Sequence, residues 1–178
     1  MRFCLISWAF SERRPLATTA EIKEEVERSA LLTDYEAVDV LWVALLKMAN
    51  KHAGNEEYAR MRSLVNGLSE PKLAAILNSP SANALLDLDP PLETILADPL
   101  ERLRPDEATE AIRQVRGKRD NDPRSAMLAL GGILKTIRNK REHGFKSSKG
   151  QRDIQILKAA RGVLTGLCDV ALAECRVP

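Results

Sequence analysis

The feature that most constrains the fold is a stripe of apolar residues in the last third of the chain. Met127, Leu130, Leu134 and Ile137 follow one another at spacings of three, four and three residues. This spacing puts all four side chains on one face of an α-helix, which has about 3.6 residues per turn. No stretch of any length shows the alternation of apolar and polar residues that is typical of a half-buried β-strand. The sequence therefore predicts an all-α protein.

Composition agrees with a helical fold. Leu and Ala are abundant and aromatic residues make up only 4% of the chain, a bias that favours helices over sheets. Hydrophobic residues at 44% and charged residues at 29% are ordinary for a globular protein, and 178 residues suffice to bury one core. We expect a single domain over residues 1–178, built as a bundle of about five to seven helices. Two long C-terminal helices should flank a basic segment.

Capping signals and helix breakers predict where the helices begin and end. A first helix should begin near Thr19. Thr33 and Glu36 form a capping-box pattern that should begin the most apolar helix of the chain, which we expect to stop near Gly54. Five prolines from Ser79 to Pro105 forbid a long helix there, so this connection should hold one or two short helices. Further helices are expected over residues 55–66, after Ser69, from Asp122 with Pro123 at its first position, and from Gln151.

The apolar stripe runs into a strongly basic segment. Residues 135–152 contain seven Lys or Arg residues and one Glu, so this segment carries +6 in a chain whose net charge is only +2. The rest of the chain therefore carries −4. Positive charge concentrated in one place indicates an anionic partner at that place.

Two residues in this segment are candidates for chemistry on RNA: Arg138 and His143. Histidine can accept and release a proton near neutral pH, and arginine offers planar donors to a phosphate that gains charge in the transition state. Asn139 and His143 share a helix face. Arg138 and His143 diverge by about 140° on an ideal helix. They could converge if the helix loosens at Gly144 or if another helix completes the site.

The residue types also allow a purely structural interpretation. A basic run at a helix C-terminus can complement the helix dipole and solubilise the surface. Arg138 and Glu142 could form an ordinary surface pair that contributes a few tenths of a kcal/mol, and His143 could bond a backbone carbonyl. Trp42 is expected in the core.

The run from Ile133 to Leu167, "ILKTIRNKREHGFKSSKGQRDIQILKAARGVLTGL", resembles the signature of the HEPN superfamily (higher eukaryotes and prokaryotes nucleotide-binding domains). Members are helical, and many carry an Arg, four to six intervening residues and then a His that is often followed by Gly. Here those positions are Arg138, His143 and Gly144, with Asn139 at the polar position after the Arg. The resemblance implies a HEPN-like helical domain that acts as a metal-independent endoribonuclease.

Within that resemblance each residue has an implied role. His143 would transfer the proton, Arg138 would stabilise the phosphate, and Asn139 would position one of them or the substrate. Some members are instead non-catalytic modules that bind RNA or nucleotide, and a structural helical dimer is a third interpretation. Charge alone suggests which residues hold the RNA backbone: Lys140, Arg141, Lys146 and Lys149.

The expected partners follow from the same features. RNA is the expected substrate, and the family often pairs its domains, so we expect a homodimer with two basic segments facing one cleft. A role in defence or stress response would add an antitoxin or regulatory protein as a partner. We expect no cofactor and no metal, because the sequence has no Cys/His cluster or carboxylate set at metal-ligand spacing. Without a signal peptide or an apolar run of about 20 residues, the chain is expected to be cytoplasmic, with free thiols.

Overall fold

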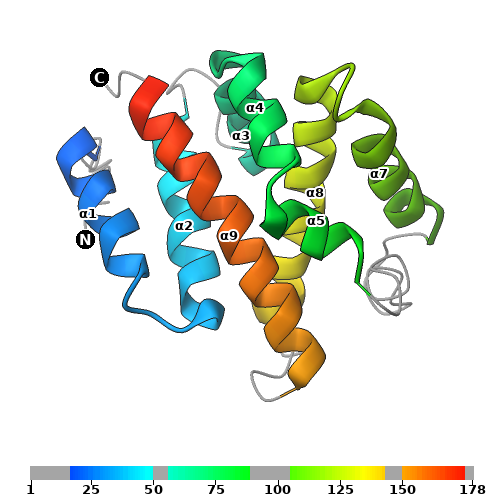
Figure 1. The fold of residues 1–178 in the computed structure, drawn as a ribbon. Coiled ribbons are helices and arrows are strands. Elements are labelled where there is room, and N and C mark those ends of the chain that lie inside the picture. The colour runs from blue at the N-terminus through cyan, green and yellow to red at the C-terminus, as the bar shows by residue number, and fades with distance from the viewer. Residues whose placement is uncertain (1–16, 50–55, 89–104, 143–149, 175–178) are drawn as a thin grey trace, which may run out of the picture.

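The computed structural model describes residues 17–49, 56–88, 105–142 and 150–174, and of residues 105–108 and 140–142 it describes the backbone alone. These parts contain eight α-helices and no strand, so the all-α prediction is confirmed (Figure 1). The helices are α1 (Thr19–Ser29), α2 (Asp34–Met48), α3 (Glu57–Gly67), α4 (Glu70–Leu77), α5 (Pro80–Leu86), α7 (Pro105–Lys118), α8 (Pro123–Glu142) and α9 (Gln151–Glu174).

The expected number of five to seven helices was too low. Helix α7 was not predicted, because it is rich in charged residues and its buried apolar side chains are only Ile112 and Val115 among the residues described. The two long C-terminal helices are both present, as α8 with 20 residues and α9 with 24.

Helix starts lie where the capping residues predicted them. The Thr33 hydroxyl accepts a hydrogen bond from the Glu36 backbone N–H at 3.3 Å, and the Glu36 carboxylate accepts one from the Thr33 N–H at 3.2 Å. Asp122 accepts from the Ser125 N–H at 3.1 Å, and hydrogen bonds from Ser125 lower the pKa of the Asp122 carboxyl. The predicted end of the second helix was wrong. Helix α2 ends at Met48 rather than near Gly54, because the backbone becomes extended at Ala49.

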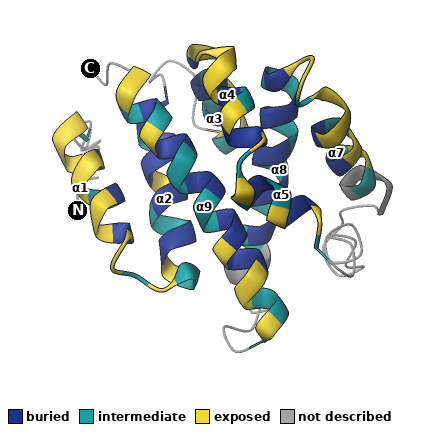
Figure 2. Cartoon of the chain, in the orientation of Figure 1, coloured by how far each residue is buried: buried dark blue, intermediate teal, exposed yellow. Residues whose placement is uncertain are grey.

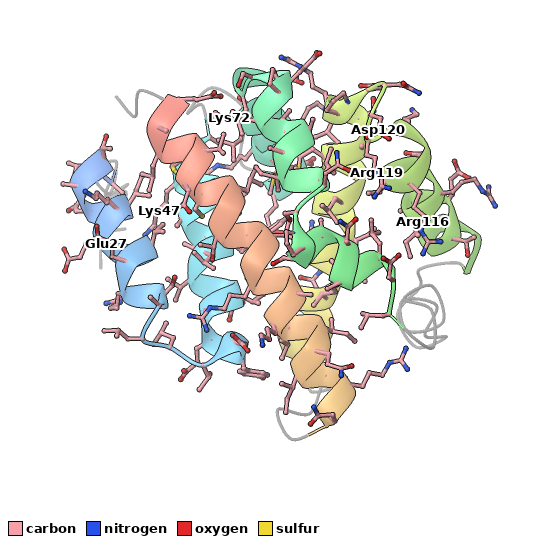
Figure 3. The ribbon with its side chains drawn as sticks, in the orientation of Figure 1. Glu27, Lys47, Lys72, Arg116, Arg119 and Asp120 are labelled. Carbon is pink, nitrogen blue, oxygen red and sulfur yellow. The ribbon has the colours of Figure 1, made fainter. Side chains whose placement is uncertain are left out.

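Helix α2 lies at the centre of the bundle. It packs against α1, α3, α8 and α9, and Figure 2 shows buried residues on most of its surface. Trp42 is only 1% exposed, which confirms it as a core aromatic. Near the end of α2, Lys47, which is labelled in Figure 3, forms an ion pair with Glu25 of α1. The apolar surface of α2 therefore requires neighbours on several sides.

The predicted stripe on α8 is buried within the chain. Met127, Leu130, Leu134 and Ile137 are each at most 1% exposed. Helices α3, α4 and α7 pack against α8, so this stripe leaves no apolar surface for a second copy of the chain. Helix α9 packs mainly against α2 and α5, and it makes less contact with α8. On α9 the side chains of Leu157, Leu164, Leu167 and Ala171 are buried, whereas Ile154 near its start is 38% exposed.

Arginine side chains bind the connections between neighbouring helices. Arg161 of α9 donates to the Asp34 carboxylate at 2.7 Å and to the Ser29 carbonyl at 3.0 Å, across the turn between α1 and α2. Arg124 of α8 donates to the Asn66 and Leu68 carbonyls at 3.0 and 3.2 Å, between α3 and α4. Each arginine satisfies carbonyls at a helix C-terminus that have no partner inside the helix.

Two further expectations concern cysteine and the membrane. Cys168 is a free, buried thiol whose pKa is raised by burial, whereas Cys4 and Cys175 lie outside the described residues. Among the helices that the structure describes, none combines the length and apolar character needed to cross a bilayer.

The burial of α2 predicts that truncating a buried side chain on this helix costs more stability than truncating an exposed one. Leu45→Ala should lower the free energy of unfolding by roughly 2–5 kcal/mol, because Leu45 is 0% exposed and the substitution leaves a cavity. Val43→Ala on the same helix should cost less than about 1 kcal/mol, since Val43 is 40% exposed. Urea unfolding followed by circular dichroism measures both. Equal losses for the two variants would contradict the central position of α2.

Candidate functional site

The candidate site lies where the buried stripe of α8 ends. Ile137 is the last residue of that stripe, and Arg138 follows it with a side chain that is 16% exposed. The helix continues to Glu142, so Arg138 is one turn from its C-terminus. Arg138 therefore lies at the boundary between the core and the basic segment.

Two carboxylates from other helices hold the Arg138 side chain. Its Nε donates to Asp39 Oδ1 of α2 at 3.1 Å, and its Nη1 donates to Glu57 Oε1 of α3 at 3.0 Å. The second Glu57 oxygen lies 3.3 Å from Lys135 Nζ, one turn earlier on α8. We call Asp39 and Glu57 the carboxylate clamp. It joins three helices at one guanidinium.

The sequence contains one signal for the clamp. Asp39 is the only charged residue between Ala37 and Leu46, in the most apolar helix of the chain. A charge at such a position is partly removed from water and needs a partner. Glu57 is the first residue of α3, where a negative charge is favourable beside the helix N-terminus.

The cluster is close to neutral overall. Arg138 and Lys135 supply two positive charges, and the clamp supplies two negative charges. The carboxylates are about one third exposed, so the pairs are weakened by solvent but are less screened than a fully exposed pair. Arg138 is thus not a simple surface residue, because its partners described here come from α2 and α3. A phosphate that approaches it must compete with two carboxylates.

The other predicted site residues are placed only in part. Asn139 is half-buried and follows Arg138 on α8. The backbone of Lys140 and Arg141 belongs to the last turn of α8, and their side chains are not described. His143, Lys146 and Lys149 lie outside the described residues. Within the described parts, the structure brings Arg138 together with Asp39, Glu57 and Lys135, none of which had been predicted as site residues.

No metal-binding cluster occurs among the residues whose side chains are described: no three of their His, Cys, Asp and Glu side chains come together as a possible set of ligands. Searches for similar proteins matched this chain to no family model, no curated protein and no solved structure.

The clamp predicts that substitutions at Asp39 and Arg138 do not act independently on stability. Asp39→Asn should lower the free energy of unfolding by about 1–3 kcal/mol, because a neutral amide replaces the carboxylate that faces a largely buried guanidinium, and its oxygen is a weaker acceptor. Arg138→Met should also destabilise the fold, and the double variant should lose less than the sum of the two by roughly 0.5–3 kcal/mol. Urea unfolding of the four proteins measures this coupling.

The exposed pair Glu110–Arg113, with its atoms 2.6 Å apart, is the matched control. Glu110→Gln should cost no more than about 1 kcal/mol, because both side chains are close to half exposed or more. Strictly additive losses at Asp39 and Arg138 would show that the clamp does not hold the arginine.

Proposed function

We propose that the C-terminal end of α8 is the active site of a HEPN-type, metal-independent endoribonuclease. The observation that carries the proposal is the clamp: the arginine at the HEPN-like position is held between two helices by Asp39 and Glu57. A rigidly held guanidinium loses little side-chain freedom on binding and needs little reorganisation during the reaction. The resemblance over residues 133–167 supplies the assignment to this family.

The proposed chemistry uses three residues of the chain. His143 takes the proton of a ribose 2′-hydroxyl, and that oxygen attacks the adjacent phosphorus. The bond from phosphorus to the 5′-oxygen breaks, the leaving oxygen takes up a proton, and a 2′,3′-cyclic phosphate remains. Arg138 stabilises the charge on the phosphate oxygens, and Asn139 positions the substrate or His143. Guanidinium has five N–H donors in one plane, so it can contact carboxylates and a phosphate together.

A non-catalytic RNA-binding module is the second candidate. The near-neutral charge of the cluster favours it, because Arg138 and Lys135 already face Glu57. In that case Arg138 would be a structural residue that joins three helices. RNA binding would then rest on the basic residues that follow Arg138 in the sequence: Lys140, Arg141, Lys146 and Lys149.

A homodimer stays part of the proposal through the resemblance alone. Its contact must lie elsewhere than the Met127–Ile137 stripe, which is buried within one chain. Light scattering should report about twice the chain mass of 19.7 kDa, and a monomer that still cleaves RNA would exclude a composite site.

The chemical prediction is that cleavage of structured RNA persists in EDTA. Products should carry 2′,3′-cyclic phosphate or 3′-phosphate ends, and His143→Ala should slow the reaction by about 10²–10⁴-fold, the usual loss for a general acid or base. Gel analysis of end-labelled RNA measures both. Loss of activity in EDTA, or full activity in His143→Ala, would exclude this mechanism.

Binding can be separated from chemistry by changing charge. Replacing Lys140, Arg141 and Lys146 by Gln should weaken RNA binding and reduce the slope of log affinity against log salt by up to about 2, since each phosphate contact contributes about 0.7 for a single strand. Cleavage at saturating RNA should be largely retained. An unchanged slope would mean that this segment is only a solvated surface.

A further inference from the structure

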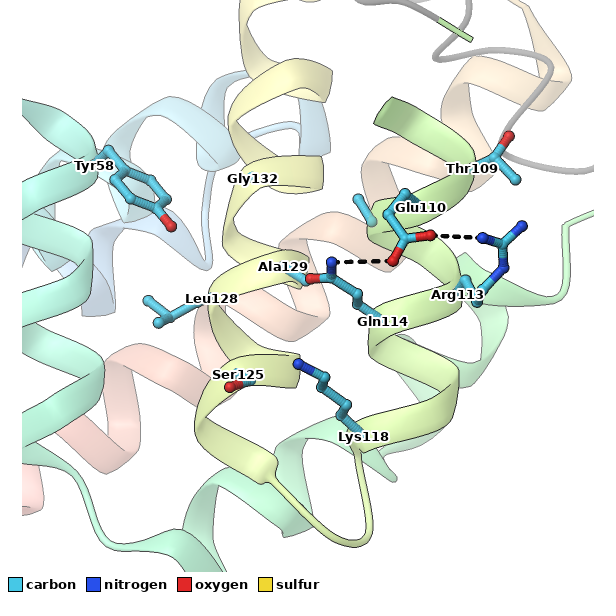
Figure 4. A pocket seen from close by; sticks show the side chains of 11 residues that line it. Tyr58, Thr109, Glu110, Arg113, Gln114, Lys118, Ser125, Leu128, Ala129 and Gly132 are labelled. Atoms are coloured by element: carbon cyan, nitrogen blue, oxygen red, sulfur yellow. Dashed lines mark hydrogen bonds and ion pairs between the residues drawn. The ribbon is translucent and has the colours of Figure 1, made fainter. Parts of the chain in front are cut away.

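A second surface on α8 lies away from the carboxylate clamp. A groove of about 1100 Å³ runs over α8 between α3 and α7 (Figure 4). Figure 4 shows Tyr58 on one side of α8, and Gln114 and Lys118 on the other. Eleven residues line the groove: Tyr58, Thr109, Glu110, Ala111, Arg113, Gln114, Lys118, Ser125, Leu128, Ala129 and Gly132.

The floor of the groove leads along α8 to the candidate site. Its floor residues Ser125, Leu128, Ala129 and Gly132 lie within an arc of about 100° on an ideal helix, and Asn139 falls in the same arc. On the opposite wall Tyr58 directly follows Glu57 of the clamp. The groove and the candidate site are therefore neighbouring parts of one surface.

The lining favours a nucleic acid strand by its chemistry. Tyr58 is 47% exposed, and the Arg62 guanidinium carbon lies 4.9 Å from the centre of its ring. Arg113 and Lys118 are exposed and basic. Glu110, the one acidic residue of the lining, is bonded to Arg113 at 2.6 Å and to Gln114 at 3.2 Å. Because Arg62 covers one face of the ring, a base would stack on the other face, and basic side chains bind phosphates.

The floor of the groove also lets a ligand approach the backbone of α8 closely. Apart from its two chain neighbours and the nearby backbone of α8, no residue has an atom within 4 Å of the position that a Cβ atom of Gly132 would occupy. Ala129 beside it is small, so a flat base could lie against the helix backbone. The groove exceeds the roughly 300–1,000 Å³ of typical small-molecule pockets, which suits a strand of several nucleotides.

A protein helix is a weaker match for this groove. Helices that bind in grooves insert several large apolar anchors into apolar pockets. Among the lining residues, Leu128 is the only large aliphatic side chain. Long polar and charged side chains form the α7 wall.

We infer that this groove binds a single-stranded segment of RNA next to the segment that enters the candidate site. The inference rests on the proposed function for the identity of the substrate. It extends that function by assigning Tyr58 to base stacking, Lys118 to phosphate contact, and Gly132 to the close approach of the strand.

The test measures RNA binding without cleavage. In the His143→Ala background, fluorescence anisotropy follows a labelled, unstructured RNA of about ten nucleotides. Tyr58→Ala should weaken binding by about 5- to 150-fold, the loss of roughly 1–3 kcal/mol expected for one stacked base. Tyr58→Phe keeps the ring and should stay within about twofold of the parent, as stacking does not need the hydroxyl.

A second pair of variants tests the groove itself. Gly132→Leu fills the floor and should weaken binding by at least about tenfold, while the gain in helix propensity keeps the fold intact. Gly67→Leu is the matched control, because its Cβ position likewise has no atom within 4 Å apart from chain neighbours and its own helix backbone, and Gly67 is not part of the groove. The affinity of the Gly67→Leu variant for RNA should be unchanged.

The outcomes separate the groove from the catalytic proposal. Affinity unchanged in both Tyr58→Ala and Gly132→Leu would overturn the inference and leave the groove to a protein partner, even if the wild type cleaves RNA. Weakened binding in these variants would support the groove even if the wild type cleaves nothing, and only the endoribonuclease assignment would then fail.

Discussion

A negative charge in the most apolar helix of the chain determines how the bundle closes around the candidate site. Asp39 is only about one third exposed, because four other helices pack against α2, so water alone does not solvate its charge. Its carboxylate is paired with Arg138 instead, and Glu57 joins the same guanidinium. Breaking such a pair leaves a poorly solvated charge, so the pairing fixes the end of α8 relative to α2 and α3. The site and the core therefore depend on one interaction.

The same interaction limits the chemistry that Arg138 can perform. Two carboxylates orient its guanidinium and also offset its charge, so the arginine is well suited to positioning and less suited to attracting a distant anion. Attraction of RNA must then come from other basic residues. The sequence supplies them in the segment after Arg138, and α7 adds the exposed Lys118.

Arginines serve mainly as connectors in this fold. Arg161, Arg124 and Arg138 each bind groups on two other helices or at the turn between them. Their planar, multiple donors allow one side chain to satisfy several acceptors. Much of the positive charge in α8 and α9 is thus engaged in holding helices together. The net charge of these helices therefore overestimates the positive charge that is free to contact a ligand.

Local signals determined most of the helix positions. Thr33 with Glu36, and Asp122 with Pro123, act through neighbours three or four residues away, and the stripe on α8 reflects the period of a single helix. Such patterns can be read directly because the interacting groups are close in the sequence. Helix α7, with few buried apolar residues, gave no comparable pattern. The candidate site residues of the basic segment depend on residue type and on the family resemblance, which are also properties of the local sequence.

Only the tertiary structure decided which distant groups meet. Arg138 is 99 residues from Asp39 and 81 from Glu57, and nothing in the local pattern of either segment specifies the other. The packing of α9 on α2 and the groove between α3 and α7 also arise from contacts between segments that are distant in the sequence. They depend on which helix faces fit together, because burial rewards total apolar area and allows many pairings of similar faces. The sequence alone could place a charge at Asp39 and at Arg138. Their contact required the packed bundle.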